Sequence, residues 1–238
     1  MIPFKSWPKT PRLENLHLRI TQKLNGTNGV IAIDKSNAWL DKADEPYFKV
    51  GSRTQWLPSP EEIKQRAKEI NEWATKKHEF ETLTQNYISP SWLEENPKPP
   101  RLNDNHGFSK WAHENKEDLI DFLGEGYHYG EWCGPGIQNG EGLTERGFYL
   151  FSPIKRYIKK DEQFINGYID TVLYRENKFG LHFVPELFNG CLNGEGVDIL
   201  LQYYTAQLKS WYPEILAVPP EGMIVEIEDK LRFKIIFE

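Results

Sequence analysis

Short apolar runs separated by turn residues dominate the N-terminal part of the chain and predict strands. Residues 16–57 alternate such runs with turns, which indicates a strand meander, with one strand running through 47–53. Asn-Gly pairs at 25–26 and 28–29 follow Lys23. Asn-Gly is a strong hairpin signal, so the simplest interpretation of this stretch is a hairpin turn beside a solvated lysine. Glycine there would also let a bulky ligand approach the backbone closely.

Helical periodicity begins at Ser59, a residue type typical of the helix N-cap, followed by a proline and two glutamates. The pattern predicts a helix over 59–83, with a shared apolar face formed by Ile63, Ala67, Ile70, Trp73 and Ala74. Further helices are predicted over 108–122 and 197–211. The segment 89–106 carries four prolines and is expected to be a loop.

The remaining segments are expected to be extended. Residues 127–151 look like strands around a glycine-rich loop, and 164–175 and 179–188 also look extended. The final segment, 222–237, alternates like two short strands. No internal repeat stands out. Strands with interspersed helices predict an α+β fold, in which antiparallel sheets carry helices on their faces. We expect residues 1–238 to form a single domain.

The composition narrows the class of protein. Hydrophobic residues make up 39% of the chain, which is enough for a sizeable core. No run of eighteen apolar residues is present, which excludes a transmembrane helix, and the first residues lack the apolar stretch of a signal peptide. Cys133 and Cys191 are the two cysteines and form neither a disulfide framework nor a zinc site. A reducing cytoplasm is therefore the expected location.

The net charge of −6 disfavours a protein that coats nucleic acid non-specifically. It does not exclude a local basic surface. The best local candidate is a basic cluster formed by Lys155, Arg156, Lys159 and Lys160, although a solvated positive face explains it equally well.

Several residues that could carry chemistry occur at separate points along the chain. Each has an ordinary structural explanation: a solvated lysine, surface acids, or an aromatic residue in the core. Their joint occurrence in one order favours a functional site. The candidates are Lys23, Asn25, Gly26, Asn28, Arg53, Glu131, Phe148, Glu221, Arg232 and Lys234.

This order of motifs resembles the signature of covalent nucleotidyltransferases, the superfamily of ATP-dependent ligases and mRNA capping enzymes. It is most similar to the RNA ligase family typified by the second RNA ligase of phage T4. The resemblance extends over about residues 12–234 and implies an ATP-grasp-like ligase fold with the nucleotide pocket between antiparallel sheets. The segments 134–138 and 184–188 resemble the RNA ligase branch in particular.

The resemblance implies a role for each motif. Lys23 is the expected nucleophile, which attacks the α-phosphate of ATP and forms a lysyl-AMP intermediate. Glu131 and Glu221 are the expected ligands of Mg²⁺, with Mn²⁺ as a substitute. Phe148 is expected to stack on adenine. Arg53 is expected to bind the nucleotide sugar and the substrate end.

The flanking motif residues complete this picture. Arg232 and Lys234 match two basic positions that hold phosphates, and both are expected to favour the neutral, nucleophilic form of the lysine amine. Asn28 matches a position beside the reacting phosphate and the nucleic-acid end. Asn25 and Gly26 are expected to contact the nucleotide. Asn25 occupies a position where relatives often carry an acid or a histidine. Because asparagine is an amide, it supplies no charge there.

The sequence therefore predicts an ATP-dependent RNA ligase. It would seal 5′-phosphate and 3′-hydroxyl ends, in a nicked duplex or at broken ends, through an adenylated 5′ end. No membrane association and no obligate protein partner are expected. Because the chain ends soon after Lys234, we expect no C-terminal OB-type or helical domain. The alternatives are a DNA ligase with the same site, a GTP-dependent capping enzyme, and a non-catalytic nucleic-acid end-binding protein.

Overall fold

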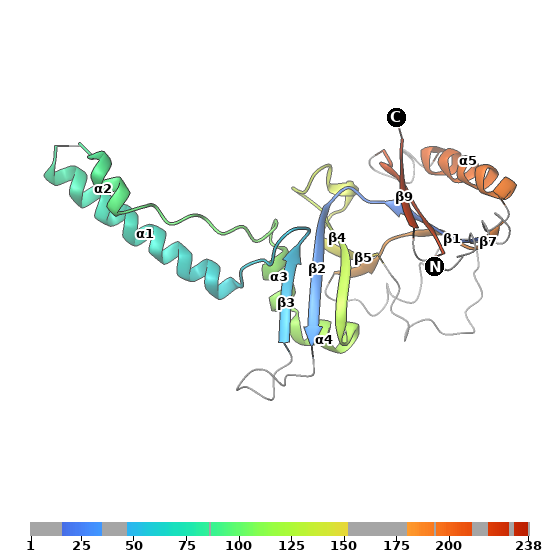
Figure 1. Cartoon of the computed structure of the whole chain (residues 1–238), viewed down its shortest axis with the longest axis horizontal. Coiled ribbons are helices and arrows are strands. Elements are labelled where there is room, and N and C mark those ends of the chain that lie inside the picture. Colours follow the sequence, from blue (N-terminus) through green and yellow to red (C-terminus); the bar gives the residue numbers. More distant parts are fainter. Residues whose placement is uncertain are drawn as a thin grey trace, which may run out of the picture.

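Two β-sheets, each with its own helices, make up the body of the structure, which is a computed structural model (Figure 1). It describes residues 16–34, 47–85, 87–151, 180–192, 194–210, 219–228 and 231–237. The strands are β1 Leu16–Lys23, β2 Thr27–Asp34, β3 Tyr47–Ser52, β4 Gly126–Cys133, β5 Gly147–Leu150, β6 Leu181–Phe183, β7 Glu186–Leu192, β8 Gly222–Ile227 and β9 Leu231–Ile236. The helices are α1 Pro60–Leu83, α2 Pro90–Glu95, α3 Phe108–Glu114, α4 Lys116–Leu123 and α5 Gly194–Ser210, with a short 3₁₀ turn η1 at Gly140–Gly142. The expected α+β class is confirmed.

The smaller sheet has the strand order β7-β1-β8-β9 and is antiparallel throughout. Its alternate residues, including Leu18, Ile20 and Met223, form a buried hydrophobic cluster with the inner face of α5. Figure 1 shows α5 lying along this sheet. Because side chains alternate between the faces of a strand, Arg19 and Lys23 face the side away from α5.

The larger sheet has the order β3-β2-β4-β5-β6 and is antiparallel except for the parallel pair β5 and β6. One of its faces packs against α3 and α4 around fully buried Phe108 and Phe148. Gly29 and Gly130 pair across β2 and β4, and a Cβ atom on either residue would lie within 3.0 Å of an aromatic ring of this core. The two glycines therefore make room for the packed rings.

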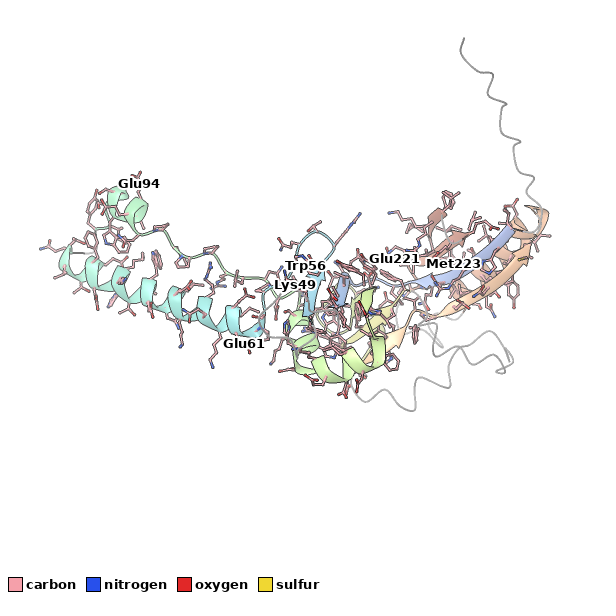
Figure 2. All side chains as sticks on the ribbon, turned by 60° about the horizontal axis from the view of Figure 1, so that its bottom comes forward. Lys49, Trp56, Glu61, Glu94, Glu221 and Met223 are labelled. Atoms are coloured by element: carbon pink, nitrogen blue, oxygen red, sulfur yellow. The ribbon has the colours of Figure 1, made fainter. Side chains whose placement is uncertain are left out.

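Helices α1 and α2 form an arm that projects from the body between β3 and α3 (Figure 1). Ser59 caps α1 through a capping box, as the sequence indicated. The rings of Phe80 and Trp92 stack at 5.2 Å, which folds α2 back onto α1. Figure 2 labels Glu61 at the base of the arm and Glu94 near its far end. No residue of α1 is buried, and the arm is joined internally by its aromatic contacts and by a hydrogen bond from Trp73 Nε1 to the Asn96 carbonyl at 2.8 Å.

The helix predictions were correct in part. The helix over 59–83 is confirmed, and α5 lies close to the predicted range 197–211. The prediction of a single helix over 108–122 was wrong, because the non-helical backbone of Asn115 divides this segment into α3 and α4. The loop expected over 89–106 contains the short helix α2, since a serine cap and a proline at its first position start a helical turn.

The strand predictions were correct locally but not in their pairing. Strands β2 and β3 pair as a meander requires, and 127–151, 179–188 and 222–237 contain strands as expected. The hairpin interpretation of the stretch after Lys23 is wrong, because β1 and β2 belong to different sheets. The partners of β1 are β7 and β8, which lie far along the chain, and local sequence pattern does not report such long-range pairing.

Some sequence features lie outside the described residues. They are the proline-rich segment 1–15, the basic cluster at 155–160 and the segment 164–175 that was expected to be extended. Within the described part of the chain, no helix combines the length and apolar character that a membrane span requires. Cys133 is buried, Cys191 is exposed, and both are free thiols.

Candidate active site

Lys23 lies where the chain passes from one sheet to the other. It is the last residue of β1, and β2 begins in the other sheet at Thr27. Lys23 pairs with Gly222 of β8, so Glu221 is its immediate neighbour, near the junction seen in Figure 2. The Lys23 ammonium forms an ion pair with Glu221 Oε2, and the two side chains are 21% and 27% exposed. Both side chains are therefore partly open to solvent.

Glu131 fixes the turn that follows Lys23. It lies opposite Asn28 in the register of β2 and β4. Its Oε1 accepts a hydrogen bond from the Gly26 backbone N–H at 3.2 Å, and its Oε2 accepts one from Asn28 Nδ2 at 2.7 Å. A Cβ atom on Gly26 would lie 2.5 Å from the carbonyl oxygen of Trp132, so only glycine fits at this point.

The Glu131 carboxyl is poised to titrate near neutral pH. Burial raises its pKa to about 7, although the hydrogen bond from Gly26, the charge of Lys23 and the hydrogen bond from Asn28 lower it. The charge of Glu221 adds a smaller upward effect on this pKa. The charge beside the amine therefore changes over the physiological range of pH.

Glu141 is a third carboxylate of the site, and the sequence analysis did not identify it. It lies in η1, in the glycine-rich loop after β4, and its Oε1 accepts a hydrogen bond from the Asn25 backbone N–H at 2.6 Å. Burial raises the pKa of Glu141, the Asn25 hydrogen bond lowers it, and the nearby charges of Glu221 and Lys23 act in opposite directions. An acid between two glycines, in a loop that begins soon after the Glu131 motif, is the signal that could have identified it.

Among the described residues, the charged groups that interact with the lysine amine are carboxylates. Glu221 contacts the ammonium directly, and the charges of Glu131 and Glu141 act on the neighbouring Cys133, whose pKa burial raises. A buried thiol of raised pKa stays protonated, so Cys133 contributes no charge. The site is thus acidic and suited to attract a cation in addition to the lysine.

The expected basic residues lie on the edge strand β9. Arg232 is exposed and donates hydrogen bonds to both carboxylate oxygens of Glu226, at 3.0 and 3.2 Å. Lys234 is also exposed and pairs with Ile224, so alternation and register place it on the same face of the sheet as Lys23, two strands away. The register thus leaves β8 between β9, which carries both cations, and the strand that carries Lys23.

The acidic residues fit a divalent cation. Oε2 of Glu221 is buried and makes no hydrogen bond within the described residues, apart from its ion pair with Lys23. No group of three or more protein ligands in a metal-binding arrangement is found in the part of the chain that the structure describes. Mg²⁺ commonly takes one or two carboxylates and completes its shell with water and phosphate oxygens. Glu131 and Glu221 could supply such a pair.

Of the adjacent aromatic residues Phe148 and Tyr149, Tyr149 faces the site. Phe148 is fully buried, and its ring packs at 4.8 Å from that of Phe108 in the core. Tyr149 lies opposite Glu131 in the register of β4 and β5, and therefore on the same face of the sheet. Its ring stacks on His182 at 4.7 Å. The sequence motif thus places two aromatic residues one position apart, and they face opposite sides of the sheet.

Arg53 lies at the end of the larger sheet that carries the site. It is exposed in the turn after β3, and the pairing of Gly29 with Ser52 brings that turn close to Asn28. Of the sequence candidates, the structure brings together Lys23, Asn25, Gly26, Asn28, Glu131 and Glu221, with Arg53 at the margin. It places Phe148, Arg232 and Lys234 apart from this group.

Asn105 supports the start of β2 and was not identified from the sequence. Its Oδ1 accepts a hydrogen bond from the Thr27 hydroxyl at 2.9 Å, and its Nδ2 donates one to the Asn28 carbonyl at 3.3 Å. Asn105, His106 and Gly107 all have positive φ values, a conformation that costs energy in residues other than glycine. Asn105 is therefore a positioning residue for Asn28. No local signal in the sequence indicates this long-range contact.

Comparison with known proteins gives structural similarity alone. No protein-family model and no curated protein matches the sequence. Three of the solved structures that it resembles are of Naegleria gruberi RNA ligase. A variant with ATP and Mn has 18% identity and a TM-score of 0.45, covering 94% of this chain and 49% of that chain. A variant with AMP and Mn has 17% identity and a TM-score of 0.45, covering 99% and 57%. A structure with PPi has 18% identity and a TM-score of 0.43, covering 94% and 50%.

The chain spans about half the length of the solved proteins that it resembles.

Proposed function

We propose that this protein is an ATP-dependent RNA ligase that works through a lysyl-AMP intermediate at Lys23. The observation that carries the proposal is the position of the Lys23 amine. It lies at the junction of two sheets, partly exposed, in contact with one carboxylate and followed by a turn that two further carboxylates hold. The order of motifs along the chain gives independent support, since it resembles that of covalent nucleotidyltransferases.

In the first step, the neutral amine attacks the α-phosphorus of ATP. A nitrogen–phosphorus bond forms, and the bond from that phosphorus to the bridging oxygen breaks to release pyrophosphate. The ammonium must first lose a proton, and Glu221 is the carboxylate in direct contact with it. Glu131 and Glu141 hold the backbone of the turn, so they keep the amine at one position during the attack.

Two further transfers would follow at the same site, and the lysine amine takes part only in the first of them. A 5′-phosphate oxygen of RNA attacks the lysyl-bound AMP, the nitrogen–phosphorus bond breaks, and a 5′–5′ pyrophosphate linkage forms. A 3′-hydroxyl then attacks the 5′-phosphate, forms the phosphodiester and releases AMP. When bound, Mg²⁺ or Mn²⁺ would neutralise phosphate charge, held by Glu131 and Glu221. Lys234 and Arg232 would contact phosphates from the edge strand.

Tyr149, rather than Phe148, is the better candidate to stack on the base. The ring of Tyr149 faces the same side of the sheet as Glu131, whereas Phe148 is enclosed in the core. A Tyr149→Ala variant should raise the KM for ATP, because a base–aromatic stack contributes about 1–3 kcal/mol. The matched comparison is Tyr149→Phe, which should keep the KM near that of the wild type.

Both sheets would act as one adenylation unit. Lys23 and Glu221 belong to the smaller sheet and its margin, whereas Asn28 and Glu131 belong to the larger sheet. The site would lose half of its residues if either sheet were removed. This supports a single nucleotidyltransferase domain over the chain.

The test is incubation of the purified protein with Mg²⁺ and α-labelled ATP, followed by denaturing electrophoresis and peptide mapping. We expect label on the peptide that contains Lys23 and none in Lys23→Ala or Lys23→Arg. Lys110→Ala, a change at an exposed lysine paired with Glu114, is the control and should label fully. Label in Lys23→Ala would refute the proposal. Label from GTP in place of ATP would favour a capping enzyme, and sealing of nicked DNA in place of nicked RNA would favour a DNA ligase.

A further inference from the structure

The face of the larger sheet opposite α3 and α4 carries two exposed tyrosines on its central strand. Tyr127 is 65% exposed and Tyr129 is 57% exposed, although β4 lies in the middle of the five-stranded order. Their rings are nearly parallel, with an interplanar angle of 14° and centroids 6.4 Å apart. Large aromatic rings on a central strand are usually covered by another layer of the protein. Here they form an open aromatic surface.

This surface continues across β2 to the edge strand. Tyr127 pairs with Ala32, and Ala32 pairs with Lys49 on β3, so all three share one face. In the next row, Gly51 forms a bridge to Trp56, which is 45% exposed. Lys49 lies over the Trp56 ring at 5.4 Å, and Figure 2 labels the two side chains next to each other. We call Tyr127, Tyr129, Trp56 and Lys49 the aromatic platform.

The aromatic platform leads directly to the candidate active site. Tyr127, Tyr129 and Glu131 occupy alternate positions of β4 and therefore face the same side, at steps of roughly 7 Å. Glu131 binds the turn that follows Lys23, and Arg53 lies at the same end of the sheet. An RNA strand whose end lies at Lys23 and which runs back along β4 would pass over Tyr129 and then Tyr127.

The chemistry of the aromatic platform suits unpaired bases. Aromatic rings on an open sheet face bind RNA by stacking on two or three bases, which requires that the bases are not already paired in a duplex. Lys49 and Arg53 supply cations near the row for phosphates. Among the described residues, the exposed large aliphatic side chains lie elsewhere, at Leu83, Leu93, Ile199, Leu231 and Ile236, so the large apolar groups exposed on this face are aromatic rings.

We propose that the aromatic platform binds the single-stranded RNA segment adjoining the end that is ligated, with one base on each tyrosine. This proposal rests on the proposed ligase function, because the bound molecule is identified as RNA from the position of the tyrosines beside the path to Lys23. It adds a specificity: substrates with unpaired nucleotides beside the break should bind better than fully paired ones.

The experiment measures fluorescence anisotropy of a labelled single-stranded oligoribonucleotide, without ATP or metal and at one fixed salt concentration. Tyr127→Ala/Tyr129→Ala should weaken binding by at least about tenfold, because two stacking partners are lost. Tyr127→Phe/Tyr129→Phe should bind as the wild type does, since phenylalanine keeps the ring. Tyr203→Ala, at a tyrosine of α5 that is 56% exposed, is the matched control and should also bind normally. A blunt RNA duplex should show no difference between the wild type and the double alanine variant.

Wild-type affinity in the folded double alanine variant would overturn the proposal, as would an equal loss of affinity for the blunt duplex. A second measurement is photo-crosslinking of an RNA that contains 4-thiouridine. It should attach to the β4 peptide, and crosslinks confined to other peptides would also overturn the proposal.

The ligase proposal and the aromatic platform proposal can be refuted independently of each other. AMP transfer to Lys23 in a protein whose RNA binding does not depend on the tyrosines would overturn the aromatic platform alone. Tyrosine-dependent RNA binding without AMP transfer would overturn the ligase function and leave an RNA-binding surface.

Discussion

The pH dependence of stability should report the burial of Glu131. Its pKa is raised by burial from 4.5 to about 7 in the folded protein, which means that the folded state holds the carboxyl proton more tightly than the unfolded chain does. The stabilisation from this group is therefore fully present below about pH 4.5 and is lost as the pH rises through about 7. Glu131→Gln removes the titration, and an amide can still accept the hydrogen bond from Gly26.

The magnitude follows from the size of the shift. Each pKa unit corresponds to about 1.36 kcal/mol, so the full shift corresponds to roughly 3 kcal/mol. Part of this loss of stability is already present at about pH 5, because that pH lies above the ordinary pKa of the carboxyl. The side chain is also only partly buried. We therefore expect a smaller change in the free energy of unfolding over the pH range that can be measured. Between about pH 5 and about pH 8 the wild type should lose roughly 2 kcal/mol more of its free energy of unfolding than Glu131→Gln does.

The assay is urea unfolding of both proteins at a series of pH values without ATP or divalent metal, followed by circular dichroism. Glu145→Gln, a change at an exposed glutamate on the loop before β5, is the control and should keep the pH dependence of the wild type. Parallel curves for the wild type and Glu131→Gln would refute the reasoning, because they would show that Glu131 titrates alike in the folded and unfolded chains.

Three further changes test other parts of the structure. Arg19→Met should lower the free energy of unfolding, measured in urea, by about 3–5 kcal/mol, because it leaves the buried carboxylate of Glu186 without its ion-pair partner. Arg19→Met combined with Glu186→Leu should cost much less, because no buried charge then remains unpaired. Gly26→Ala should cost about 1–3 kcal/mol in the same assay and reduce AMP labelling of Lys23, because its Cβ would collide with backbone and side-chain atoms. Ser59→Ala should cost about 1 kcal/mol of helix stability, seen as reduced helical signal in far-UV circular dichroism. Unchanged stability or labelling in any of the three would contradict the contact concerned.

Much of the local structure follows from the sequence, because it depends on neighbouring residues. The serine cap, the proline and the acidic first turn are sufficient to start α1, and its capping box forms within one helical turn. The motif residues Lys23, Glu131 and Glu221 were found from their order along the chain, and the structure places them at one junction.

The faces of the sheets were not decided by the sequence. Phe148 and Tyr149 are adjacent aromatic residues on one strand, so alternation alone requires that they face opposite sides. Which of the two is buried depends on the side that α3 and α4 cover, and on the space left by Gly29 and Gly130. This is a property of the packed layers, which no short window of sequence contains.

The composition of the site was likewise decided by tertiary structure. Lys23 is not in a hairpin, because β1 pairs with β7 and β8, and the turn that follows β1 crosses to the other sheet. That crossing brings the backbone of Asn25 to Glu141, and the pairing of β1 with β8 brings the ammonium of Lys23 to Glu221. The sequence therefore determined the longer helices α1 and α5, the positions of most strands and most of the reactive groups. Only the pairing of distant strands determined which charges surround the amine, because electrostatic effects depend on distance in space and not on distance along the chain.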